Sequence, residues 1–118
     1  MRKPIIYILV ICAFWSCEEL MDIENISKKH VELLAPVDNA TINTNTLTFT
    51  WNPIEGAEKY HLQIAQPTFE EALQIVRDTL ISHVNFRDSL NTNTYQWRIR
   101  AVNAEYTTVY TTNTITIE

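Results

Sequence analysis

Three histidines are the residues best suited to acid–base or metal chemistry in this 118-residue sequence, and they lie far apart. His30, His61 and His83 have neither the i, i+2 nor the i, i+4 spacing that brings two imidazoles to one metal ion. His61 is instead expected on the polar side of a strand, as a solvated side chain. The sequence therefore predicts no metal site and no cofactor.

The pair Ser82-His83, with Asp78 or Asp88 nearby, has the residue types of a hydrolytic triad. Nothing around Ser82 resembles the strained turn that exposes a nucleophilic serine, and Gly56 is the only glycine in the sequence. The sequence thus lacks the material for a glycine-built oxyanion turn or phosphate loop. We expect no catalytic residues and a protein that is not an enzyme.

The segments that must position any binding surface have the pattern of β-strands. Apolar and polar residues alternate with a period of two over 46–52, 60–65 and 95–101. Residues 107–117 are rich in Thr, Val, Ile and Tyr, which favour strands. The segment 69–81 has partly helical spacing and is expected to be a turn followed by a strand. Short strands without a sustained helical pattern predict an all-β, antiparallel sandwich.

The order of these features resembles a fibronectin type III domain over residues 31–118. The resemblance rests on Pro36 after the first strand, on Trp51 followed by Pro53, and on the segment 94–103, which ends in Ala, Val and Asn. It implies an antiparallel β-sandwich of seven strands. Folds of this kind serve as adhesion, spacer and carbohydrate-associated modules, so the resemblance does not identify a function.

The resemblance and the strand parity assign five residues to the core. Tyr95 occupies the position of the tyrosine corner, whose hydroxyl bonds back to the main chain. The strand alternation places the large aromatic residues on the inward face, which favours a packing role in the core. The alternative is that they form an aromatic platform that binds a ligand. The expected core residues are Trp51, Tyr60, Leu90, Tyr95 and Trp97.

The outer face of the same sheet is the candidate interaction surface. The resemblance makes the third and sixth strands neighbours, so their polar residues should lie together. Arginine offers planar donors that suit carboxylates or stacked aromatic rings. The alternative is a merely solvated sheet face on which the arginine stems cover apolar neighbours. The candidate face consists of His61, Gln63, Gln96, Arg98 and Arg100.

The first residues have the pattern of a secretory signal peptide, 1–16. Arg2 and Lys3 precede an apolar run that ends before Cys17 and is too short to cross a bilayer as an anchor helix. Ser16-Cys17 resembles the relaxed lipobox of Bacteroidota-type lipoproteins, which implies a membrane anchor through acylated Cys17. The alternative is an uncleaved anchor or a buried strand.

The mature chain would then consist of a lipidated cysteine with a polar tether, 17–30, followed by the domain at 31–118. In Bacteroidota-type lipoproteins, acidic residues such as Glu18 and Glu19 just after the cysteine resemble a surface-export signal, which implies an outer-membrane, surface-exposed location. A simple solvated tether is the alternative.

Charge excludes one class of partner. The formal net charge is −5, and two of the nine basic residues, Arg2 and Lys3, belong to the leader. A nucleic-acid surface needs clustered lysines and arginines. We therefore expect no nucleic-acid partner.

The expected function is that of a cell-envelope lipoprotein presenting one domain to a protein or glycan. The alternative is a structural spacer, or an accessory subunit of a polysaccharide-uptake complex with no ligand of its own. Two tripeptides, Asp78-Thr79-Leu80 and Asp88-Ser89-Leu90, also resemble the O-glycosylation motif of Bacteroidota-type secreted proteins. They make Thr79 and Ser89 candidate acceptors.

Overall fold

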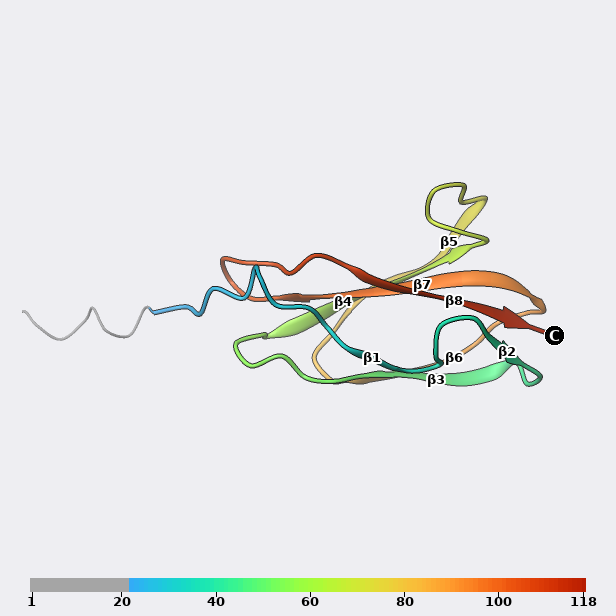
Figure 1. Cartoon of the computed structure of the whole chain (residues 1–118), viewed down its shortest axis with the longest axis horizontal. Helices are drawn as coiled ribbons and strands as arrows, with labels where there is room; N and C mark the ends of the chain where they lie inside the picture. Colours follow the sequence, from blue (N-terminus) through green and yellow to red (C-terminus); the bar gives the residue numbers. More distant parts are fainter. Residues whose placement is uncertain (1–21) are drawn as a thin grey trace, which may run out of the picture.

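Eight β-strands form the part of the chain that the computed structural model describes, residues 22–118, and that part contains no helix. The three-stranded sheet has the order β1 (Leu33–Ala35), β3 (Thr46–Trp51) and β6 (Asn85–Ser89). The five-stranded sheet has the order β2 (Ala40–Ile42), β8 (Thr111–Ile117), β7 (Asn93–Val102), β4 (Lys59–Gln66) and β5 (Gln74–Ile81). The two sheets form the layers of a sandwich, as Figure 1 shows.

The prediction of seven strands is wrong by one, and the additional strand is β2. After Pro36 the chain no longer pairs with β3. It crosses to the other sheet, where β2 pairs with β8 in parallel. Asn39 makes the crossing with a φ of 66°, and Asp38 Oδ1 accepts a hydrogen bond from Thr114 N at 2.7 Å. A strand of three residues is too short to show a period of two, so the sequence pattern does not reveal it.

Alternation along β7 separates the core from the outer face. Every second residue from Tyr95 to Ala101 is buried, while the residues between them are half-buried. The Trp97 ring meets Phe49 of the opposite sheet edge-on, with 4.9 Å between ring centroids. All five residues expected in the core are at most 6% exposed: Trp51, Tyr60, Leu90, Tyr95 and Trp97.

Tyr95 has the contacts of a tyrosine corner. Its hydroxyl donates a hydrogen bond of 2.8 Å to the carbonyl oxygen of Asn91, four residues earlier. Burial raises the pKa of the Tyr95 hydroxyl, and the bond to Asn91 opposes that rise. The ring therefore packs in the core while its polar end is paired with the main chain.

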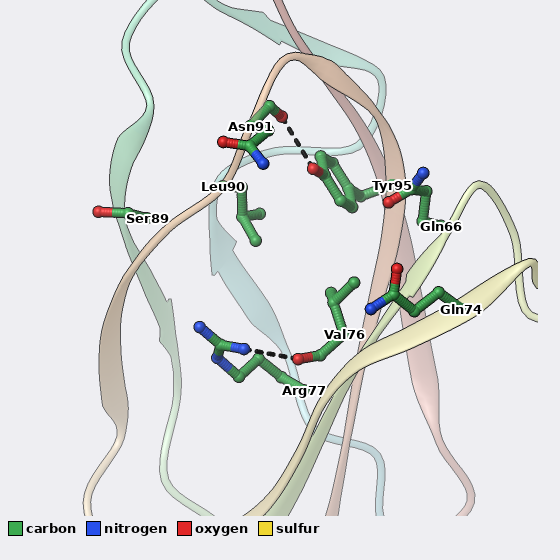
Figure 2. A pocket seen from close by; sticks show the side chains of 8 residues that line it. All are labelled: Gln66, Gln74, Val76, Arg77, Ser89, Leu90, Asn91 and Tyr95. Atoms are coloured by element: carbon green, nitrogen blue, oxygen red, sulfur yellow. Dashed lines mark hydrogen bonds between the residues drawn. The ribbon is translucent and has the colours of Figure 1, made fainter.

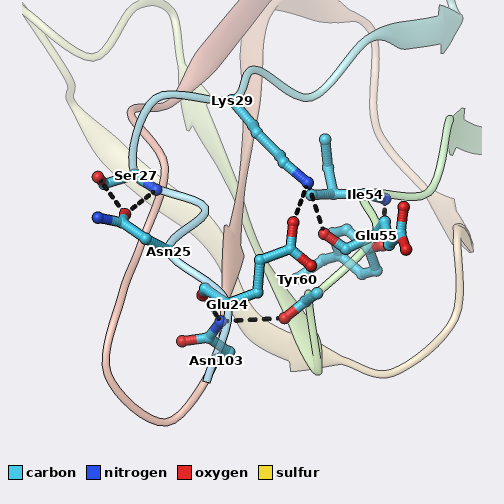
Figure 3. Close-up of polar contacts among 9 residues, drawn as sticks. Glu24, Asn25, Ser27, Lys29, Ile54, Glu55, Tyr60 and Asn103 are labelled. Carbon is cyan, nitrogen blue, oxygen red and sulfur yellow. Dashed lines mark hydrogen bonds and ion pairs between the residues drawn. The ribbon is translucent and has the colours of Figure 1, made fainter. Parts of the chain in front are cut away.

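The packed structure begins earlier than the expected boundary at residue 31. Ile26 is fully buried in the core. Asn103 Nδ2 donates to Glu24 O at 2.8 Å and to Gly56 O at 3.0 Å, while Lys29 Nζ pairs with Glu24 Oε2 at 2.6 Å (Figure 3). Ile26 lies in a mostly polar stretch without the alternation of a strand, and Gly56 and Asn103 at this contact lie far away in the sequence. Residues from Glu24 onward thus belong to the folded unit.

Candidate functional site

The five residues of the candidate face lie together on β4 and β7. His61 is paired with Arg100, Gln63 with Arg98, and the next outward position of β7 holds Gln96. All five side chains are half-buried on the outer side of the five-stranded sheet. We call these residues, with the Phe69, Asp78 and Tyr110 side chains that contact them, the β4–β7 face.

Arg98 lies between two aromatic rings. The carbon of its guanidinium is 3.9 Å from the centroid of Phe69 and 4.1 Å from that of Tyr110. Arg98 Nε and Nη2 both donate to Gln63 Oε1, at 2.9 and 2.6 Å. These contacts fix the guanidinium plane and use its donors inside the domain.

Sequence reasoning missed both of these aromatic residues. Phe69 lies in the loop between β4 and β5, where its backbone N–H donates to Gln96 Oε1 at 2.9 Å. Tyr110 lies just before β8. Phe69 lies outside the alternating segments, and Tyr110 falls in a part of the expected strand 107–117 that does not alternate, so strand periodicity points to neither as a site residue.

His61 is not the solvated side chain that its strand position suggests. Its side chain is 18% exposed, its Nε2 faces Asp78 Oδ1, and its Nδ1 is 2.9 Å from the Tyr110 hydroxyl. Hydrogen bonds from His61 and then from Gln63 hold the pKa of the Asp78 carboxyl below its usual value. The expectation failed because Asp78 reaches His61 from β5 and Tyr110 reaches it from the residue just before β8.

A hollow of about 340 Å³ lies on the outer side of the sheet above His61. Arg100 and Leu80 flank His61 on the two neighbouring strands. The Arg100 guanidinium is 4.8 Å from the Tyr110 ring, and its Nε is buried with no hydrogen-bond partner within residues 22–118. The hollow is lined by His61, Asp78, Thr79, Leu80, Arg100 and Val102.

A second hollow, of about 240 Å³, opens between the edges of the two sheets (Figure 2). Arg77 of β5 reaches Asp88 of β6 across this gap, with Nη2 2.9 Å from Oδ1. Amide side chains and the Tyr95 hydroxyl give the hollow a polar lining. The lining residues are Gln66, Gln74, Val76, Arg77, Ser89, Leu90, Asn91 and Tyr95.

The two candidate glycan acceptors have different surroundings. Ser89 is exposed at the sheet edge, with its Oγ 3.3 Å from Thr46 Oγ1. Thr79 is half-buried and lines the hollow beside Arg100. An acceptor hydroxyl must be exposed, so Ser89 is the more accessible of the two, and its modification stays a prediction.

Cys17, the expected site of lipid attachment, lies outside the described residues. Within residues 22–118 there is no helix long and apolar enough to cross a membrane. The same residues contain no group of three or more His, Cys, Asp or Glu side chains placed to hold a metal ion.

Two packed β-sheets with the strand order described above form an immunoglobulin-like β-sandwich. No family model matches the sequence, and no curated protein matches it. Among solved structures, the chain is similar to the fibronectin(III)-like modules of Clostridium thermocellum CbhA, with a TM-score of 0.55 and 11% identity over 75% of this chain and 95% of the other. The fold is therefore fibronectin type III-like.

Two further solved structures are similar over the same 75% of this chain. One is FN3tt mut, with a TM-score of 0.51, 18% identity and 89% of that chain covered. The other is a Fn3-like protein from Clostridium thermocellum, with a TM-score of 0.51, 16% identity and 88% covered. Identities this low establish the fold alone.

Proposed function

We propose that this protein is a cell-envelope lipoprotein that presents its fibronectin type III-like domain to a protein or glycan partner through the β4–β7 face. The observation that carries the proposal is that the stacked Arg98, Phe69 and Tyr110 side chains hold Tyr110 beside Arg100 and His61, which line an open hollow on this face. Side chains that are already ordered lose less conformational entropy when a partner binds. Arginine and tyrosine are also enriched among residues that contribute most to binding.

A non-catalytic role is part of the proposal. The His61, Asp78 and Tyr110 side chains are bonded to one another, and the network contains no serine, threonine or cysteine that could act as an activated nucleophile. Fibronectin type III-like domains are typically binding or spacer modules. A spacer or accessory subunit without a ligand is the competing function.

The lipid anchor would set the orientation of the domain. Seven residues lead from Cys17 to Glu24, and at roughly 3.6 Å per residue they span at most about 25 Å. Glu24 is held at the end of the sandwich that carries Gly56 and Asn103, and the C-terminus lies at the opposite end (Figure 1). An anchored domain would therefore keep the Gly56 end near the membrane and direct the other end outward.

Replacing Cys17 with alanine tests the anchor. We expect the full chain with Cys17→Ala to lose its acylated membrane form, because the thiol that accepts the first lipid is gone. Metabolic labelling with a fatty-acid analogue and fractionation of the host cells measure this directly. A matched Cys12→Ala chain should be labelled like the wild type, and unchanged labelling of the Cys17 variant would refute the anchor.

Reversing the charge of the face tests the binding role. We expect the double variant Arg98→Glu with Arg100→Glu to bind its partner at least tenfold more weakly. Binding is measured with surface extracts and labelled polysaccharides added to cells that carry the full chain. Arg87→Glu, on an exposed site of the three-stranded sheet, is the control and should bind like the wild type. Equal binding by a double variant that is folded and exported would favour the spacer role.

A further inference from the structure

The two arginines of the β4–β7 face differ in what remains available for a ligand. Arg98 already donates twice to Gln63 and is covered on both sides by aromatic rings. Arg100 has one aromatic neighbour, Tyr110, and a buried Nε without a hydrogen-bond partner within residues 22–118. The Arg100 Nε is enclosed by the protein and out of reach of a ligand in the hollow, so the terminal Nη groups of Arg100 are the donors that remain for a ligand.

The hollow beside Arg100 has the size and lining of a small-ligand site. Its volume of about 340 Å³ lies within the usual range of such sites, about 300–1,000 Å³. Arg100 lies on one side of His61 and Leu80 on the other, because the two residues are paired with His61 from opposite directions. A ligand in the hollow would therefore meet a cation on one side and an apolar side chain on the other.

Asp78 supplies acceptors for hydroxyl groups in the same hollow. One carboxylate oxygen faces His61 and the other accepts from Gln63 Nε2 at 3.2 Å. A carboxylate has about four lone-pair sites, so two remain free for donors from a ligand. The Asp78 side chain is 56% exposed and within reach of solvent.

The apolar part of the hollow suits the C–H face of a sugar ring. Leu80 is 58% exposed and Val102 is half-buried nearby, so both offer apolar surface to the hollow. Apolar contact with a few well-placed polar groups is the general composition of a small-molecule site. A phosphate dianion fits less well, because it carries twice the charge of a sugar carboxylate for Asp78 to repel and has no apolar face to pack on Leu80.

We infer that this hollow binds a carboxylate-bearing sugar, a hexuronic acid residue of an acidic polysaccharide. The Arg100 guanidinium pairs with the sugar carboxylate, Asp78 accepts from ring hydroxyls, and the ring packs on Leu80. This inference rests on the proposed binding role of the β4–β7 face and names the ligand class for it.

The test uses the full chain purified in detergent and three probes in calorimetric titrations. The probes are trigalacturonate, its neutral methyl ester, and a glutamate-rich peptide. We expect trigalacturonate to bind at least tenfold more tightly than the methyl ester. We also expect Arg100→Gln to weaken its binding by at least tenfold, because it removes the cation that pairs with the sugar carboxylate.

Controls separate binding from folding. Arg87→Gln should bind like the wild type, and Arg100→Lys should recover part of the affinity because it keeps the charge but not the planar pair of donors. Thermal melting should show that all variants are folded. Equal binding of the methyl ester, or undiminished binding by folded Arg100→Gln, would overturn the inference.

The outcomes also distinguish the inference from the proposed function. Tighter binding of the glutamate-rich peptide than of trigalacturonate would assign the hollow to a protein partner and overturn the sugar class. If no probe binds while the double arginine variant still loses its surface partner, the inference fails and the binding role stands. If no probe binds and the double arginine variant also keeps its surface partner, both the inference and the proposed binding role fail.

Discussion

Replacing Trp51 with alanine should lower the free energy of unfolding by about 3 to 5 kcal/mol. Trp51 is 1% exposed at the end of β3. Its ring meets the Tyr60 ring of the opposite sheet edge-on, with 5.8 Å between the ring centroids. Small domains have a total stability of roughly 5–15 kcal/mol, so this loss removes a large part of it. At about 4–8 °C per kcal/mol, the melting temperature should fall by more than about 12 °C.

The contribution of Trp51 should come from packing rather than from hydrogen bonding. Its Nε1 is buried and has no hydrogen-bond partner within residues 22–118. Trp51→Phe keeps an aromatic ring, so it should cost clearly less than Trp51→Ala. Leu73→Ala, at a position that is 83% exposed, is the control and should change stability by less than about 0.5 kcal/mol.

Thermal and urea denaturation of the same variants measure these differences. A melting temperature of Trp51→Ala equal to that of the wild type would show that the Trp51 side chain does not lie in the core. The slope of the urea transition should stay unchanged if only the native state is affected.

Ile26→Ala should have the second largest effect, a loss of about 2 to 5 kcal/mol. Ile26 is fully buried in the core although it lies in a polar stretch of the sequence. Its packing is tight, because a Cβ on Gly56 would approach Ile26 Cγ2 to 3.0 Å and Glu24 Oε1 to 2.8 Å. Truncation of Ile26 leaves a cavity that these neighbours can fill only by moving.

A matched isoleucine makes this prediction specific to the segment. Ile75 on the edge strand β5 is 46% exposed, so Ile75→Ala should cost much less than Ile26→Ala. Denaturation curves of the two variants give the comparison. Equal losses, or a stable Ile26 variant, would mean that residues 24–30 are a free tether, as the sequence pattern suggests.

The five strand residues of the candidate site were predictable, but the three residues that contact them, Phe69, Asp78 and Tyr110, were not. Period-two alternation placed Arg98 and Arg100 on one outer face, and adjacent strands brought His61 and Gln63 beside them. The stacking of Arg98 depends on Phe69, which comes from a loop with no regular pattern. The different roles of the two arginines therefore become visible only from their three-dimensional surroundings.

The alternation of apolar and polar residues in the sequence was sufficient to predict the all-β class. It also predicted which residues of strands such as β3 and β7 face the core, because side-chain direction along a strand repeats every two residues. It was insufficient wherever a contact joins residues far apart in sequence. The short strand β2, the burial of Ile26 against the Gly56 turn, and the His61–Asp78 pair all arise from such contacts. The tertiary structure decides these features because the register between strands and the course of loops are fixed by packing of the whole core.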